Sequence, residues 1–213
     1  MIKAVLFDMD GVLIDAKDWH YEALNRALDL FGMAIDRDSH LATYDGLPTR
    51  RKLELLTKTR GFPVGLHAFV NRLKQSYTQE ITYARCRPVF YHRDALMRLK
   101  RDGLKLAVCS NSIGATVQLM MQLSGLDPYL DLQLSNEDVS RAKPDPEIYT
   151  LAMKRLGLEP SEVLILEDND HGIQAARASG GHLLTVGQTQ DVTYSRIREA
   201  IDAADNGAVR ARS

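Results

Sequence analysis

Short apolar runs alternate with amphipathic helical patterns over most of this chain. The runs with the length and composition of buried strands are residues 3–7, 104–109, 130–134, 163–166 and 182–186. Patterns with helical spacing lie around the later runs, at about 92–102, 113–124, 145–156, 170–179 and 190–203. Short apolar strands separated by helices are typical of a parallel sheet covered on both faces. The pattern therefore predicts an α/β fold with a Rossmann-like parallel-sheet core.

The stretch from 15 to 82 interrupts this alternation. It holds helical patterns and turn signals but no convincing strand. Apolar residues recur at three- and four-residue spacing from residue 19 to residue 31, and Gly32 ends that pattern. We therefore predict a small all-helical cap domain at residues 15–82, inserted after the first strand of a core domain that comprises residues 1–14 and 83–213.

Composition narrows the class of protein. Lys and Arg (27) nearly balance Asp and Glu (28), so no long-range field is available to attract nucleic acid or an anionic membrane surface. No apolar run approaches the roughly 18 residues that span a bilayer, and the apolar N-terminus lacks the pattern of a signal peptide. Cys86 and Cys109 form neither metal-ligand spacing nor a disulfide framework. We expect a cytoplasmic protein without a nucleic-acid or membrane partner.

Polar residues cluster where the predicted strands end. Ligands of parallel sheets bind beyond the carboxyl ends of the strands, which meet at one edge. The polar residues that follow three of the strands carry carboxyl, hydroxyl or amide groups, and one lysine lies in a later loop. They are Asp8, Asp10, Ser110, Asn111, Glu167, Asp168 and Lys143. We expect these side chains to lie at the same edge of the sheet.

The chemistry of these residues suggests a metal-dependent reaction at phosphorus. Several carboxylates at one edge repel one another unless a cation lies between them. Oxygen ligands without His or Cys favour a hard cation such as Mg²⁺. An aspartate can attack phosphorus and form an acyl phosphate, while a second carboxyl moves a proton. A lysine and a serine hydroxyl can hold the phosphoryl oxygens.

Each residue taken alone also has a structural interpretation. Asp10 with Gly11 is a common turn dipeptide, and Asp170 and Ser112 could cap the helices that follow them. Lys143 could be an ordinary surface lysine. The hypothesis of a site depends on their joint occurrence, because polar clusters follow three predicted strands in the right order.

With these motifs the sequence resembles the haloacid dehalogenase superfamily, in particular its helical-cap branch with the β-phosphoglucomutase-like phosphatases and phosphomutases. The resemblance covers nearly the whole chain. The segments that carry it are residues 7–15, 110–112, 143–146 and 167–168, with Gly172, Ala175 and Ala176 beyond them.

The resemblance implies a role for each matching residue. Asp8 would be the nucleophile and a metal ligand, and Asp10 the general acid and base, with its backbone carbonyl on Mg²⁺. Lys143 would pair with Asp8 and the phosphoryl group. Asp168 would bind the metal, and Glu167 would be a ligand or would support one. Ser110 would hold the phosphoryl group, and with Asn111 it is a candidate substrate contact.

The helical insert matches the family less well. Members of this branch often carry Ser or Thr where this chain has Ala16, and the mutases have an arginine where this chain has Thr49, with Arg50 next to it. His20 matches a histidine that such mutases use on substrate. His20, Arg50 and Lys74 are therefore the candidate substrate contacts of the insert, although His20 could instead serve helix packing.

Three functions follow from these residues. The favoured one is a Mg²⁺-dependent phosphatase acting on a small phosphorylated metabolite, such as a sugar or polyol phosphate, through an aspartyl phosphate on Asp8. The alternative is a phosphomutase of the β-phosphoglucomutase type. A non-catalytic binding protein is disfavoured, because Asp8, Asp10 and Lys143 are all present. The identity of the substrate and the oligomeric state do not follow from the sequence, which is compatible with a monomer.

Overall fold

The computed structural model describes the backbone of residues 1–210 and the side chains of residues 1–207. The chain forms two compact units: Met1–Asp15 with Arg87–Ser213, here called the sheet domain, and Ala16–Cys86, here called the helical domain. The predicted end of the insert at residue 82 falls inside helix α4 (His67–Arg85), so the chain leaves the helical domain only after Cys86.

The sheet domain is built on a parallel five-stranded sheet with the strand order β3-β2-β1-β4-β5. The strands are β1 (Ala4–Phe7), β2 (Lys105–Cys109), β3 (Leu132–Leu134), β4 (Val163–Glu167) and β5 (His182–Thr185). Every residue of β1 and β4 is buried, as are all residues of β2 after Lys105. This burial on both faces explains why these strands are continuous apolar runs in the sequence, and it confirms the predicted fold class.

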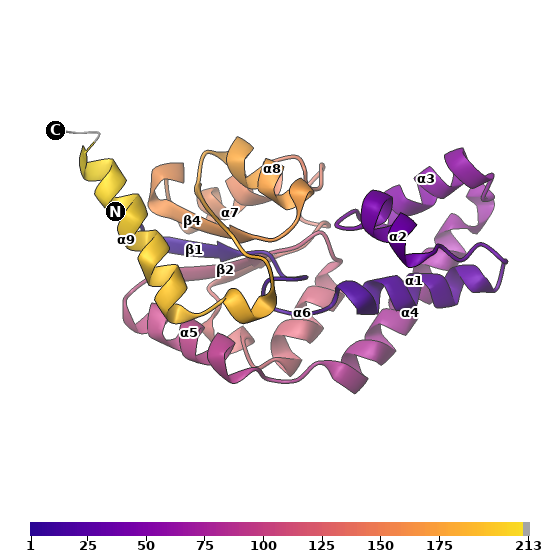
Figure 1. Cartoon of the computed structure of the whole chain (residues 1–213), viewed down its shortest axis with the longest axis horizontal. Coiled ribbons are helices and arrows are strands. Elements are labelled where there is room, and N and C mark those ends of the chain that lie inside the picture. Colours follow the sequence, from indigo (N-terminus) through magenta and orange to yellow (C-terminus); the bar gives the residue numbers. More distant parts are fainter. Residues whose placement is uncertain (211–213) are drawn as a thin grey trace. The chain divides into compact units, whose positions relative to one another are not determined.

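Helices cover both faces of the sheet (Figure 1). Helices α5 (Phe90–Arg101) and α9 (Tyr194–Arg210) pack together on one face, where α6 (Gly114–Leu123) lies beside β3. Helices α7 (Glu147–Leu156) and α8 (Asp170–Ser179) pack together on the other face. Short 3₁₀ turns occupy Asp127–Tyr129, Pro160–Glu162 and Thr189–Asp191. This three-layer arrangement places the loops that follow β1, β2 and β4 at one edge of the sheet.

The helical domain has a hydrophobic core of its own. Its helices are α1 (Lys17–Asp29), α2 (Arg37–Ser39), α3 (Thr49–Arg60) and α4, with a π-helical turn at His40–Tyr44 and a 3₁₀ turn at Val64–Leu66. Leu24, Leu28, Leu56 and Phe62 are all buried in this core. Each such side chain contributes about 1.5–3 kcal/mol of transfer free energy, so the insert is a packed unit rather than a long loop.

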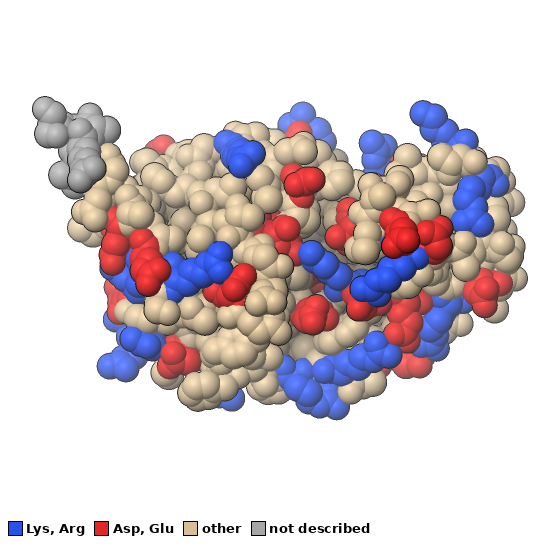
Figure 2. Space-filling view, viewed as in Figure 1, with Lys and Arg blue, Asp and Glu red and all other residues tan. Residues whose placement is uncertain are grey.

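Charged side chains of both signs lie on the molecular surface (Figure 2). On the face shown in Figure 2, Lys and Arg side chains are interspersed with Asp and Glu, as the near balance of 27 basic and 28 acidic residues leads one to expect. Within the described part of the chain, no helix combines the length and the apolar character that a membrane crossing requires.

Candidate active site

The carboxyl ends of β1, β2 and β4 hold the first polar residues of the candidate site. Sheet hydrogen bonding continues one residue beyond two of these strands, because Asp8 N donates to Leu166 O (3.0 Å) and Ser110 N donates to Leu134 O (3.0 Å). Glu167 is itself the last residue of β4. The backbone of these residues is therefore fixed by the rigid sheet, and their side chains are presented at its carboxyl edge.

Lys143 reaches this edge from the loop before α7, and its ammonium group lies among the strand ends. Its Nζ donates to Asp8 Oδ1 (2.6 Å), Glu167 Oε1 (2.7 Å) and the Cys109 carbonyl (2.8 Å). The lysine side chain is 2% exposed. These acceptors match the three donors of an ammonium group, so Lys143 is held as a fixed positive charge beside Asp8.

Asn111 fixes the backbone of Lys143. Its side chain accepts from Lys143 N (3.1 Å) and donates to Lys143 O (3.3 Å), while Asn136 Nδ2 donates to Asn111 O (2.7 Å). The structure thus uses the Asn111 amide to position the lysine loop. The role of Asn111 as a substrate contact stays a prediction.

Asp8, Glu167 and Asp168 bring three carboxylates together. One oxygen from each lies within 4.8 Å of the others. Burial raises the pKa of Asp8 well above its usual value; Lys143 opposes this shift, whereas Glu167, Asp168 and Asp10 add to it. Burial alone would lower the pKa of Lys143, but Asp8 and Glu167 outweigh it and raise that pKa, so the lysine stays charged. A cation bound at the three carboxylates would hold Asp8 in its ionised, nucleophilic form.

The donor set fits Mg²⁺. It consists of carboxylate oxygens alone, which hard cations prefer. The nearby sulfur, in Cys109, is fully buried, and this burial raises its thiol pKa to about 12. Cys109 contributes only its carbonyl, and that group accepts from Lys143. Asp8 and Asp168 are the residues that would hold the ion.

Asp10 lies in a tight turn after Asp8. Gly11 has a φ of 96°, which L side chains rarely adopt, and its N–H donates to Ile14 O (2.7 Å). The Asp10 carboxylate accepts from Ser112 Oγ (3.1 Å) and lies outside the group of three carboxylates. The proposed backbone contact of Asp10 with a metal stays a prediction.

Two capping interpretations from the sequence are wrong. Ser112 does not cap α6, because Ile113 holds the N-cap position and the Ser112 hydroxyl donates to Asp10. Asp170 is the first residue of α8 rather than its cap; Asn169 caps that helix, with its side chain accepting from Gly172 N (3.0 Å). Sequence reasoning missed the link between Ser112 and Asp10, for which the only signal was that both follow strand ends.

Glu167 is held from several sides. Its Oε1 accepts from Lys143 and from the hydroxyl of Tyr149, and its Oε2 accepts from Asp168 N (3.2 Å). A Cβ added at Gly172 would overlap the Glu167 carboxylate. The glycine therefore leaves the space into which this carboxylate fits.

We predict that Gly172→Ala displaces Glu167 and destabilises the protein. The added methyl overpacks the site, so the free energy of unfolding should fall by about 1–3 kcal/mol. Gly207→Ala is the matched control: it lies in α9, where an added Cβ meets nothing within 4 Å, and it should raise stability by about 0.5–1 kcal/mol. Chemical denaturation of both variants measures this difference. Equal effects of the two substitutions would contradict the assigned role of Gly172.

The candidates of the helical domain divide into a pair and a single residue. Lys74 Nζ lies 3.2 Å from His20 Nδ1, and Lys74 is buried. Arg50 is largely exposed, and its Nε donates to Glu54 Oε1 (3.0 Å). The structure therefore brings His20 and Lys74 together and places Arg50 in a surface ion pair. The role of all three in substrate binding stays a prediction.

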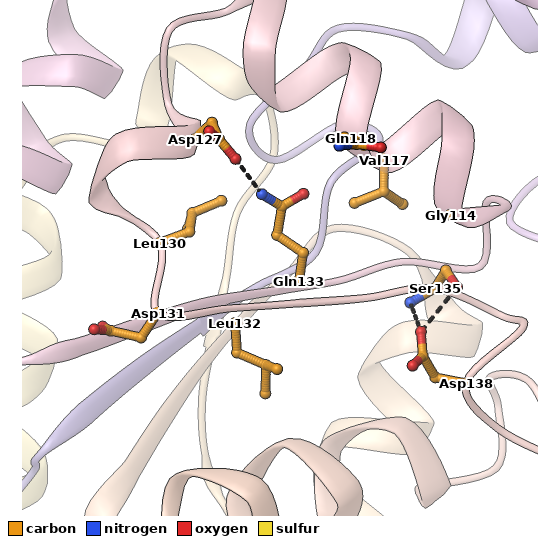
Figure 3. A pocket seen from close by; sticks show the side chains of 10 residues that line it. All are labelled: Gly114, Val117, Gln118, Asp127, Leu130, Asp131, Leu132, Gln133, Ser135 and Asp138. Carbon is orange, nitrogen blue, oxygen red and sulfur yellow. Dashed lines mark hydrogen bonds between the residues drawn. The ribbon is translucent and has the colours of Figure 1, made fainter.

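A pocket of about 440 Å³ lies beside edge strand β3 and contains none of the clustered carboxylates (Figure 3). Several polar side chains of its lining already have partners within the protein. Gln133 Nε2 donates to Asp127 (2.6 Å), and Ser135 Oγ donates to Asp138 (2.9 Å). Nothing in this arrangement indicates a reaction, so the carboxylate edge remains the candidate active site.

Comparison with known proteins shows the family of this chain. Residues 5–186 match the family model for haloacid dehalogenase-like hydrolases. A phosphorylated carbohydrates phosphatase from Thermotoga maritima is 30% identical over 180 residues, which cover 84% of this chain and 82% of that protein. A fructose-1-phosphate phosphatase from Escherichia coli is 27% identical over 176 residues, covering 83% and 92%.

A solved structure shares the fold of this chain. The crystal structure of a β-phosphoglucomutase from Clostridium difficile superposes with a TM-score of 0.83 at 21% identity, and the match covers 98% of this chain and 100% of that one. The family that the sequence resembles is thereby confirmed. From its family match, its curated relatives and its fold, the chain is an enzyme that belongs to the haloacid dehalogenase-like hydrolase family.

Proposed function

We propose that the protein is a Mg²⁺-dependent phosphatase that hydrolyses a small phosphorylated metabolite, in particular a sugar or polyol phosphate, through a phosphoryl group carried on Asp8. The observation that carries this proposal is the 2.6 Å contact of Lys143 Nζ with Asp8 Oδ1, next to the carboxylates of Glu167 and Asp168. The substrate class is supported by the relative that acts on phosphorylated carbohydrates.

In the first step, one carboxylate oxygen of Asp8 attacks phosphorus and the bond to the leaving oxygen breaks. Lys143 holds the Asp8 carboxylate in place. Asp10 donates a proton to the leaving oxygen, so the metabolite departs as a neutral alcohol. In the second step, Asp10 takes a proton from water, the water oxygen attacks phosphorus, and inorganic phosphate leaves a restored Asp8.

Other groups hold the transferring phosphoryl oxygens. Ser110 is fully buried, and its Oγ accepts from Ser112 N (3.0 Å), which leaves the hydroxyl proton for a phosphoryl oxygen. Because Lys143 already makes three hydrogen bonds, a phosphoryl oxygen would share one of its donors with a present acceptor. Mg²⁺, when bound by Asp8 and Asp168, supplies charge that neutralises these oxygens.

We also propose that the basic pair of His20 and Lys74, together with Arg50, contacts the substrate. The support for this proposal is the close approach of Lys74 Nζ to His20 Nδ1 and the family resemblance of His20. The proposed cytoplasmic location is supported by the two cysteines, Cys86 and Cys109, which are buried and are not joined to each other by a disulfide.

The direct test is release of inorganic phosphate from a panel of sugar and polyol monophosphates, with and without a catalytic amount of sugar bisphosphate. Phosphate release that does not depend on bisphosphate supports the phosphatase. Isomerisation of the sugar phosphate with little release would instead identify a phosphomutase, in which a sugar phosphate recaptures the phosphoryl group from Asp8. The Asp8→Asn variant is the blank for contaminating phosphatases.

Removal of divalent cations should abolish this activity. Because a bound metal ion contributes several kcal/mol to stabilising the transition state, chelation should reduce phosphate release by about 100-fold or more. Added Mg²⁺ should restore the rate, and Ca²⁺ should restore it poorly because it is larger and prefers more ligands. A chelated enzyme that keeps its full rate while remaining metal-free by elemental analysis would overturn the assignment of Mg²⁺.

A further inference from the structure

Tyr149 lies directly behind the catalytic carboxylates. It is fully buried on α7, and its hydroxyl donates to Glu167 Oε1, the same oxygen that accepts from Lys143. Lys143 Nζ also lies 4.8 Å from the centroid of the tyrosine ring. A single side chain therefore contacts both the lysine that holds Asp8 and the carboxylate that holds the lysine.

The hydroxyl is the part of this side chain that packing does not explain. The ring lies in an apolar layer with Ile148, Ala152 and Met153, where phenylalanine would fill nearly the same volume. Burying a hydroxyl costs free energy unless it forms a hydrogen bond. Here it bonds to Glu167. The polar atom of Tyr149 thus acts on the site and not on the core.

We propose that Tyr149 is a positioning residue for phosphoryl transfer, whose hydroxyl fixes Glu167 so that Glu167 orients Lys143 and the backbone of Asp168. This inference rests on the proposed function of the site. Its geometric basis is that Glu167 Oε1 has two donors, Tyr149 and Lys143, while Oε2 accepts from Asp168 N. Glu167 then serves the metal site by holding its neighbours in place.

Loss of the hydroxyl has a defined consequence. In Tyr149→Phe, Glu167 Oε1 keeps only Lys143, so the carboxylate can rotate and draw the ammonium away from Asp8. Residues that orient metal ligands typically contribute about 10- to 100-fold in metal affinity or activity. We expect Tyr149→Phe to lower kcat by about 10-fold, to leave KM nearly unchanged and to weaken Mg²⁺ binding by about 10-fold.

The experiment compares Tyr149→Phe with Tyr194→Phe. The control also removes a hydroxyl that donates to a carboxylate, because Tyr194 OH donates to Asp102 (2.8 Å) on the surface of the same domain. Each variant is titrated with Mg²⁺ alone in a calorimeter and assayed for kcat and KM. The expected result is weaker Mg²⁺ binding and lower kcat in Tyr149→Phe only. Parent values of both quantities in Tyr149→Phe would overturn the proposal, even if that variant melts at a lower temperature.

Glu167→Ala provides an independent test, because alanine has no oxygen to accept from Tyr149 and Lys143. If the hydroxyl acts through the Glu167 carboxylate, adding Tyr149→Phe to Glu167→Ala should change Mg²⁺ affinity much less than adding it to the parent. Equal effects in both backgrounds would overturn the proposed route. The calorimetric titration needs no substrate. A parent enzyme that binds Mg²⁺ but releases no phosphate would therefore contradict the proposed function, while the titration still decides the role of Tyr149.

Discussion

Replacing Asp8 by Asn should reduce phosphate release by roughly 10⁴-fold or more, as loss of a nucleophile does in other enzymes. The amide has nearly the same shape as the carboxylate, but it cannot form an acyl phosphate. Steady-state phosphate release from the best substrate of the panel measures the effect. The control is Asp202→Asn, which changes an exposed carboxylate that pairs with Arg198 in α9. This variant should retain the parent rate.

The same substitution should leave the fold intact. Burial and the neighbouring carboxylates raise the pKa of Asp8, which means that the folded protein holds this negative charge at a cost. An asparagine removes that charge and can still accept from Lys143, which also keeps Glu167 and Cys109 as acceptors. Parent-like circular dichroism together with lost turnover is the expected outcome. A variant that turns over at the parent rate would show that Asp8 is not the nucleophile.

The covalent intermediate can be observed directly with Asp10→Asn. A phosphomonoester with a good leaving group, such as p-nitrophenyl phosphate, needs little proton donation in the first step, whereas hydrolysis of the aspartyl phosphate still needs a base. The variant should therefore accumulate phosphorylated protein, visible by intact-mass spectrometry as one added phosphoryl group. If the double variant Asp8→Asn,Asp10→Asn shows no added phosphoryl group, Asp8 is the residue that carries the group in Asp10→Asn.

The fold could be predicted from sequence because its central strands are buried on both faces. In β1 and β4 every position is buried, so the strands appear as unbroken apolar runs bounded by polar residues. The end of the insert was harder to place, because α4 continues to Arg85 without a break in its helical pattern. Residues 64–85 contain one glycine, Gly65, and no proline, so neither residue type marks the end of the insert.

The site residues that directly follow strands could be predicted from the sequence. The residues whose role depends on the direction of a side chain were harder to predict. Asp8 and Glu167 follow from the sheet edge, whereas Lys143 lies 135 residues from Asp8 in the chain, and its contact was implied by the family resemblance rather than by spacing. Tyr149 was missed because an aromatic residue in the apolar stripe of a helix indicates packing. No sequence pattern tells where its hydroxyl points.

Among the substitutions predicted for this protein, Lys143→Met should have the second largest effect. It should lower the free energy of unfolding as well as the activity. Methionine retains most of the length but loses the ammonium group, and it leaves the side chains of Asp8 and Glu167, which are 7% and 0% exposed, without their shared cation. Breaking a buried ion pair from one side typically costs about 3–5 kcal/mol. Denaturant unfolding in Mg²⁺-free buffer near neutral pH should show a loss of this size. Lys3→Met, which breaks the exposed pair with Glu162, should cost no more than about 1 kcal/mol.

The pH dependence of that loss distinguishes charge from packing. Lys143 opposes the upward shift of the Asp8 pKa, so its removal raises that pKa further above the unfolded value of about 3.9. A raised carboxyl pKa stabilises the folded state below the unfolded pKa, and this stabilisation is lost as the pH rises through the folded pKa. The stability gap between Lys143→Met and the parent should therefore be small near about pH 4 and should widen toward neutral pH. Surface carboxyls with lowered pKa values, such as Asp138, affect both proteins alike and cancel from the difference.

Mg²⁺ should narrow the stability gap between Lys143→Met and the parent at neutral pH, because it replaces the missing positive charge. A gap that is independent of both pH and Mg²⁺ would mean that Lys143 contributes through packing, and the electrostatic role assigned to it would be wrong.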